Sequence, residues 1–108
     1  MAEVVVVVKV VAAEGKVDEV IVGFAACVEE THKEEGCIAY ALHRDNNDAD
    51  TLVLVERWRS QEDLDAHNQT SHAAALFAVA GTPGVLVEPP QLTFATSLGL
   101  GDPGKGNL

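Results

Sequence analysis

The valine-rich run at residues 3–12, EVVVVVKVVA, restricts the fold more than any other stretch of this chain. Valine branches at Cβ and fits the pleated surface of a sheet, so the run predicts a strand. Successive side chains of a strand point to opposite faces. Both alternating sets are apolar except at Lys9, namely Val4, Val6, Val8 and Val10 on one face and Val5, Val7 and Val11 on the other. We therefore expect both faces of this strand to be covered.

The residues that follow predict a helix and a hairpin. Residues 17–33 carry apolar side chains at helical spacing, and Gly36 follows as a candidate left-handed helix terminator. Residues 37–44 and 51–58 alternate with the period of strands, and the turn-forming sequence DNNDAD joins them. This pattern predicts two antiparallel strands.

The second half of the chain predicts a broken helix and a last strand. Ser60 followed by Asp63 resembles a capping box, which starts a helix that runs to Ala80. The polar sequence at residues 68–71 favours caps and turns, so we predict a break there and a second segment over residues 71–80. Gly81, Pro83 and Gly84 stop the helix, and residues 91–98 alternate again as a fourth strand.

The order of elements is β, α, β, β, α, β, which predicts an α+β, ferredoxin-like βαββαβ fold with an antiparallel sheet. The helices can cover one face of that sheet. The other apolar face predicts a homodimer in which two sheets pack face to face, a dimeric α+β barrel. We expect one domain over residues 1–98 and a disordered, glycine-rich C-terminal tail over residues 99–108.

The charge composition bears on partners and location. The net charge is -10, and the seven Lys and Arg residues form no cluster, which argues against nucleic acid or anionic lipid as a partner. The valine run has no basic region before it and is interrupted at Lys9, so we expect neither a signal peptide nor a membrane span. Cys27 and Cys37 fit small buried residues of a reduced compartment, and we expect a cytoplasmic protein.

Three stretches carry a resemblance to a known family: EEGCIAYALHRD, LVLVERWRSQEDLDAH and TSHAAAL. They resemble the acidic-Gly-Cys strand entry, the Glu-x-Trp with an inward helical histidine, and the Ser-x-His segment of the antibiotic biosynthesis monooxygenase family of dimeric α/β barrels. The resemblance covers residues 3–97. It implies a dimer with one pocket per subunit, between sheet and helices, that takes a small aromatic or quinol-like ligand.

The resemblance also implies an activity. Members of the family are said to oxygenate quinols or polycyclic phenols without metal, flavin or nicotinamide. The sequence agrees, since it has no GxGxxG after a strand, no Walker loop, no HExxH and no paired cysteine ligands. We therefore predict no cofactor and no metal. Such a protein needs a base that titrates near neutral pH and a dry apolar pocket, and histidine is the natural base.

His67 shares a helix face with Leu64, so it is expected to project towards the sheet, either as a histidine satisfied at the edge of the core or as the base. The family resemblance, which places a histidine here, makes it the first candidate for the base. His72 lies five residues further, about 140° around an unbroken helix at roughly 100° per residue, so only the predicted break could bring both into one pocket. Trp58 closes a strand, where it is either a core aromatic or a wall for a flat substrate.

Other candidates follow from strand parity and helix faces. Tyr40 and His43 lie on opposite faces of their strand, so at most one can face the helices, and His43 is also a catalytic candidate. Candidates for apolar lining, which are equally well explained as core, are Phe24, Leu64, Leu76 and Phe77. The charged residues Glu56, Arg57 and Arg59 predict a solvated salt-bridge cluster.

Alternative functions remain open at this level. Relatives that degrade haem use a histidine on this helix and an asparagine on the first strand, but residues 3–12 contain no asparagine. Another branch isomerises phosphorylated sugars, and the sequence shows no clear phosphate cradle. The non-enzymatic alternative is a dimeric binding or stress-response module that holds an apolar ligand without converting it.

Overall fold

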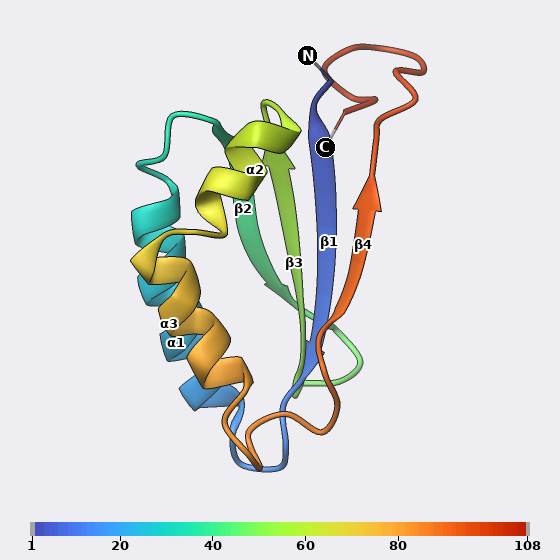
Figure 1. Ribbon diagram of the computed structural model, residues 1–108. Coiled ribbons are helices and arrows are strands. Elements are labelled where there is room, and N and C mark those ends of the chain that lie inside the picture. Colours follow the sequence, from blue (N-terminus) through green and yellow to red (C-terminus); the bar gives the residue numbers. More distant parts are fainter. Residues whose placement is uncertain (1, 108) are drawn as a thin grey trace.

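The computed structural model describes residues 2–107 and contains two layers, an antiparallel sheet and a layer of helices (Figure 1). In chain order the elements are β1 (Val4–Val11), α1 (Val17–Thr31), β2 (Cys37–Arg44), β3 (Thr51–Trp58), α2 (Gln61–His67), α3 (Ser71–Ala80) and β4 (Gln91–Ala95). The strands lie in the order β2-β3-β1-β4. The predicted ferredoxin-like α+β fold is confirmed.

The register of β1 decides which side chains face the helices. Val6 lies opposite Glu56 on β3 and Phe94 on β4, while Val8 lies opposite Leu54 and Leu92. Residues opposite one another share a face of the sheet. Buried side chains of this face and of the helices form one core, which includes Val6, Val8, Val10, Leu52, Leu54, Trp58, Val20, Phe24, Leu64 and Leu76.

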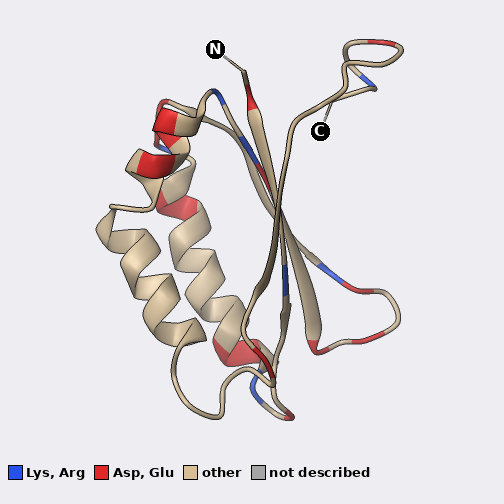
Figure 2. Cartoon of the chain, turned by 45° about the vertical axis from the view of Figure 1, so that its right-hand side comes forward, with Lys and Arg blue, Asp and Glu red and all other residues tan. Residues whose placement is uncertain are grey.

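The other face of the sheet has no helix on it among the described residues (Figure 2). Its centre is formed by Val5 and Val7 of β1 with Val53 and Val55 of β3, and these four side chains are only partly buried. The sheet is therefore apolar on both faces, as the valine run predicts. Helices α1 and α3 cover only one of these two faces (Figure 1).

The break between α2 and α3 is confirmed and has a local cause. Thr70 lies between the two helices with an extended backbone, and its hydroxyl accepts a hydrogen bond from the N–H of Ala73 at 3.2 Å. The same hydroxyl donates to the carbonyl of His67 at 2.7 Å. One side chain thus ends α2 and caps α3. No helix within residues 2–107 is both long and apolar enough to cross a membrane.

Two details of the chain differ from the sequence prediction. β4 ends at Ala95 rather than at residue 98. α1 ends at Thr31, and Gly36 is not among the glycines with positive φ, so the prediction that Gly36 terminates the helix in a left-handed conformation is wrong. Gly36 meets a packing requirement instead, because a Cβ at this position would collide with the side chain of Asp63.

Replacing Gly36 by alanine tests this packing requirement. Gly36 is buried at the entry to β2, and its carbonyl accepts a hydrogen bond from the N–H of Arg59 at 2.9 Å, so the backbone has little room to shift. We expect Gly36→Ala to lower the free energy of unfolding by about 1–3 kcal/mol, the usual cost of overpacking. Urea denaturation at constant m-value measures the change.

Gly23→Ala is the matched control. Gly23 lies within α1, and a Cβ there would meet the methyl groups of Val79 at 3.4 Å, an ordinary contact. Alanine in a helix interior is about 0.5–1 kcal/mol more favourable than glycine, so this variant is expected to gain stability. Equal behaviour of the two variants would contradict the role given to Gly36.

Candidate functional site

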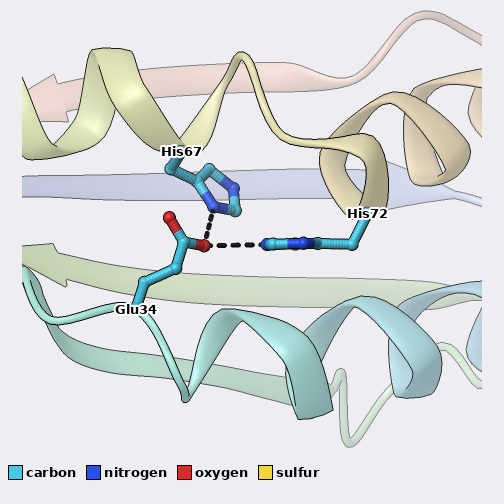
Figure 3. A group of neighbouring side chains, drawn as sticks. All are labelled: Glu34, His67 and His72. Atoms are coloured by element: carbon cyan, nitrogen blue, oxygen red, sulfur yellow. Dashed lines mark hydrogen bonds and ion pairs between the residues drawn. The ribbon is translucent and has the colours of Figure 1, made fainter.

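One carboxylate and two imidazoles meet at the end of the helical layer where α1 leads into β2 (Figure 3). Glu34 lies in the turn between α1 and β2, His67 is the last residue of α2, and His72 is the second residue of α3. The break at Thr70 turns α3 away from the direction of α2. This change of direction brings the two histidine rings to 5.7 Å between centroids, which an unbroken helix would not allow.

Both histidines bind the same oxygen of Glu34. The distance from His67 Nδ1 to Glu34 Oε2 is 2.7 Å, and the distance from His72 Nε2 to the same oxygen is 2.8 Å. An ionised carboxylate only accepts hydrogen bonds, so each ring donates from the nitrogen that faces Glu34. This arrangement fixes the tautomer of neutral His67 as the Nδ1–H form, with its lone pair on Nε2.

The second nitrogen of His67 remains accessible. Nε2 of His67 has no hydrogen-bond partner among residues 2–107, although every fully buried side-chain nitrogen or oxygen in that range has one. Nε2 is therefore not fully enclosed, and His67 is one of the residues that line the adjoining cavity. A ligand in that cavity would meet an imidazole nitrogen that can accept a proton.

Aromatic side chains hold the ring of His67 in place. The centroid of Trp58 lies 4.7 Å from that of His67, with the ring planes at 39°, and Tyr40 lies at 5.4 Å. Trp58 is completely buried, and it is not one of the residues that line the cavity. The interpretation of Trp58 as a wall for the substrate is wrong, because the indole packs behind His67 and supports it.

Glu56 is a second carboxyl group at the site, and its predicted solvated position is wrong. Its side chain lines the cavity and is only 6% exposed, and Oε1 accepts a hydrogen bond from Trp58 Nε1 at 2.9 Å. Burial raises the pKa of Glu56, while the hydrogen bond from Trp58 and the nearby His67 oppose that rise. The other two members of the predicted cluster do form surface ion pairs, Arg57 with Glu3 and Arg59 with Asp63.

The cavity lies between the sheet and the helices and has a volume of about 210 Å³. Its wall is apolar except near His67 and Glu56. Five predicted lining residues contribute to it, Phe24, Tyr40, Leu64, Leu76 and Phe77. β4 adds Leu92 and Phe94, which the sequence interpretation missed, although their alternation places them on the same face as Val6 and Val8.

Besides Trp58, two predicted site residues do not line the cavity. His43 lies opposite Val53 on the face of the sheet turned away from the helices, and its side chain is exposed, so it cannot reach His67. His72 reaches the site only through Glu34. Tyr40 faces the helices, as parity allows, and its hydroxyl lies 3.6 Å from Cys27 Sγ. Burial raises the pKa of Tyr40, so its phenol stays protonated.

The arrangement of elements and site residues can be compared with known proteins. The sequence model of the antibiotic biosynthesis monooxygenase family matches residues 3–79, which include Glu34, Glu56, His67 and His72. An uncharacterized protein of Synechocystis is 29% identical over 77 residues, which make up 71% of this chain and 51% of that protein. The chain thus spans about half the length of the curated relative that it matches.

Solved structures share the whole fold. A protein of Mycobacterium tuberculosis has a TM-score of 0.82 at 26% identity, covering 90% of this chain and 96% of that chain. A conserved protein of Methanosarcina mazei has a TM-score of 0.81 at 27% identity, covering 89% and 93%. A candidate antibiotic biosynthesis monooxygenase of Nitrosomonas europaea has a TM-score of 0.84, covering 90% and 91%, and at 18% identity it shows the fold alone.

The raised pKa of Glu56 predicts a pH dependence of stability. A carboxyl group whose pKa rises on folding holds its proton more tightly in the folded state, so the free energy of unfolding falls as the pH rises through the window between the two pKa values. That window starts at the usual carboxyl pKa near 4.5 and extends upward. Glu56→Gln removes the titration and keeps an acceptor for Trp58, so we expect the variant to gain stability relative to wild type across this window.

Urea denaturation of both proteins over a series of pH values measures this difference. Glu62→Gln, at an exposed position in the first turn of α2, is the control for loss of a carboxylate elsewhere. A difference between wild type and Glu56→Gln that does not change with pH would show that burial leaves Glu56 unperturbed.

Proposed function

Because the chain belongs to the antibiotic biosynthesis monooxygenase family, we propose that it oxidises a small quinol or phenol with dioxygen and that His67 is the general base. Family membership supports a monooxygenase or small-molecule-binding role, and the finer assignment is our proposal. The observation that carries it is the state of His67, which lines an apolar cavity, with Nδ1 held by Glu34 and Nε2 without a hydrogen-bond partner among residues 2–107.

The proposed reaction needs no external reductant. Nε2 of His67 takes the proton of the bound phenol, and the resulting phenolate passes one electron to dioxygen. Recombination of the two radicals gives a peroxide, which loses water. The substrate loses two hydrogen atoms and gains one oxygen atom, the second oxygen leaves as water, and the substrate supplies all four electrons. An apolar wall assists, because it keeps bulk water away from the radical pair.

The size of the cavity favours small substrates. An apolar cavity of about 150 Å³ holds benzene, so the volume of 210 Å³ suits one substituted ring or a compact pair of rings. A polycyclic phenol would extend past the half-exposed side chains of Leu92 and Phe94 at the β4 side. We therefore propose a monocyclic or bicyclic quinol in preference to an anthrone.

Oxygen uptake tests the proposal. A panel of monocyclic quinols, naphthoquinols and anthrones is offered to the protein in an oxygen electrode. We expect uptake with the smaller quinols and a loss of about 10²–10⁴-fold in kcat/KM for His67→Ala, the usual contribution of a positioned base. His43→Ala, on the opposite face of the sheet, is the matched control and is expected to retain full activity.

A binding measurement separates catalysis from the non-catalytic alternative. Trp58 is the only tryptophan, and its ring packs against His67, so its fluorescence reports occupation of the cavity. Quinols that change this fluorescence without any uptake of oxygen would establish the binding module instead. Uptake that is equal in wild type and His67→Ala would remove His67 as the base.

We also propose that the protein works as a homodimer whose two sheets face each other. The support is the outer face of the sheet, where Val5, Val7, Val53 and Val55 form an apolar centre. An exposed apolar face of this kind is typical of an association surface. Two sheets packed face to face would remove both valine faces from water at the usual spacing of about 10 Å.

Replacing Val7 by glutamate tests the dimer. Val7 lies opposite Val55 at the centre of this face, and a charge buried there costs several kcal/mol, so we expect Val7→Glu to be a monomer. Light scattering after gel filtration measures the mass at micromolar concentration. Val22→Glu, on the exposed side of α1, is the control and should stay dimeric. A monomeric wild-type protein would refute the proposed assembly.

A further inference from the structure

The cluster of Glu34, His67 and His72 brings together three side chains of the kinds that bind transition metals (Figure 3). One possible ligand atom of each residue lies within 4.8 Å of those of the other two. We propose that these three residues form a site for a divalent metal ion of borderline softness, for which Zn²⁺ is the representative. The site is independent of the proposed oxidation, which uses no metal.

The two distances from Glu34 to the histidine nitrogens fit such an ion with a small adjustment, and the third distance, between the two nitrogens, is at most 4.8 Å. Zinc binds histidine nitrogen at about 2.0–2.1 Å and carboxylate oxygen at about 2.0–2.2 Å, which places neighbouring ligands about 3.0–3.4 Å apart. The two nitrogen-to-oxygen distances are 2.7 and 2.8 Å. The ligands therefore need to separate by a few tenths of an ångström, which rotation of the Glu34 side chain can supply.

The electrostatic surroundings favour a cation. Among the described residues, Glu34 forms ion pairs only with the two histidines, while Lys33 pairs with Glu30. Arg59 forms ion pairs with Asp63 and Glu35 instead of Glu34. Glu56 is a buried carboxyl group near the partly exposed Glu34. No lysine or arginine among residues 2–107 thus forms an ion pair with Glu34, and a divalent ion would balance its charge.

Access and ligand type narrow the choice of ion. The side chains of Glu34 and His72 are each 19% exposed, so an ion can enter from solvent and keep water at its remaining positions. Two imidazoles with one carboxylate suit zinc, nickel, cobalt or iron(II) better than magnesium or calcium, which prefer oxygen ligands throughout. The free thiols of Cys27 and Cys37 are not part of the set.

A bound metal would change the chemistry of His67. Coordination through Nδ1 moves the proton of the neutral ring to Nε2, the nitrogen proposed above as the base. The ring would then offer a hydrogen-bond donor to the cavity instead of a lone pair. Metal binding is therefore expected to inhibit the proposed oxidation, a consequence that rests on the proposed function, whereas the metal site itself does not.

The test uses the full chain without a polyhistidine tag, freed of metal by a chelator and dialysed. Titration calorimetry with Zn²⁺ is expected to give one ion per chain, with a rise in the unfolding temperature. Glu34→Gln and His72→Ala should each weaken binding by more than about 100-fold, since even second-shell changes cost 10–100-fold. The matched controls are His32→Ala and His43→Ala, which remove exposed histidines outside the cluster and should bind as wild type does.

Cobalt gives a readout that does not depend on any variant. Co²⁺ in the wild-type protein should show the visible bands of nitrogen and oxygen ligands. A strong thiolate-to-cobalt band would place the metal at a cysteine and overturn the proposal. Absence of saturable Zn²⁺ binding, or equal binding by wild type, Glu34→Gln and His72→Ala, would overturn it as well.

Oxygen uptake with added Zn²⁺ distinguishes the proposed metal site from the proposed role of His67 as base. The assay uses any quinol that the protein oxidises. Inhibition in wild type that is lost in His72→Ala supports both the site and His67 as base. Zinc that binds through the three residues without inhibiting supports the site and removes His67 as the base. Inhibition without stoichiometric binding would count against the site.

Discussion

The hydrogen bonds from two imidazoles to one oxygen of Glu34 hold together the helical side of the candidate site. They join the turn that enters β2, which holds Glu34, to the end of α2 and the start of α3. His67 and His72 lie 33 and 38 residues after Glu34 in the chain. Hydrogen bonds to a charged group contribute about 1.5–3 kcal/mol each, roughly twice the value of neutral ones. The same contacts therefore stabilise the junction of the helices and decide which nitrogen of His67 can act as a base.

The sheet imposes the other main constraint. β1 is its second strand from the edge and carries valine on both faces, but the chain supplies helices for one face only (Figure 1). α3 contains no Asp, Glu, Lys or Arg and packs beside α1, so these two helices cover the same face of the sheet (Figure 2). The outer valines have no helix over them among residues 2–107, and the second sheet of the proposed homodimer would cover them.

Local patterns in the sequence are sufficient to predict the fold and part of the candidate site. The bounds of β2 and β3 follow from period-two alternation around a turn, and Thr70 with its polar neighbours marks the break that redirects His72. Glu56 was misplaced because its charge was given more weight than its parity with Leu54 and Trp58. Glu34 could not be assigned, since its partners lie across the fold and no local pattern pairs them.

The cavity is polar at one end and apolar at the other, because its lining residues come from different elements. Its polar groups include His67, Glu56 and Asn68, and the first two lie near the start of β1 and the end of β3, next to Trp58 and Tyr40. Its apolar groups extend to Leu92 and Phe94 on β4, which are more than half exposed. A phenol can satisfy both ends only with its hydroxyl towards His67 and its ring towards β4. Under the proposed function, the base and the part of the wall that selects the substrate would lie on different elements, because β4 makes no contact with the hydrogen bonds of Glu34.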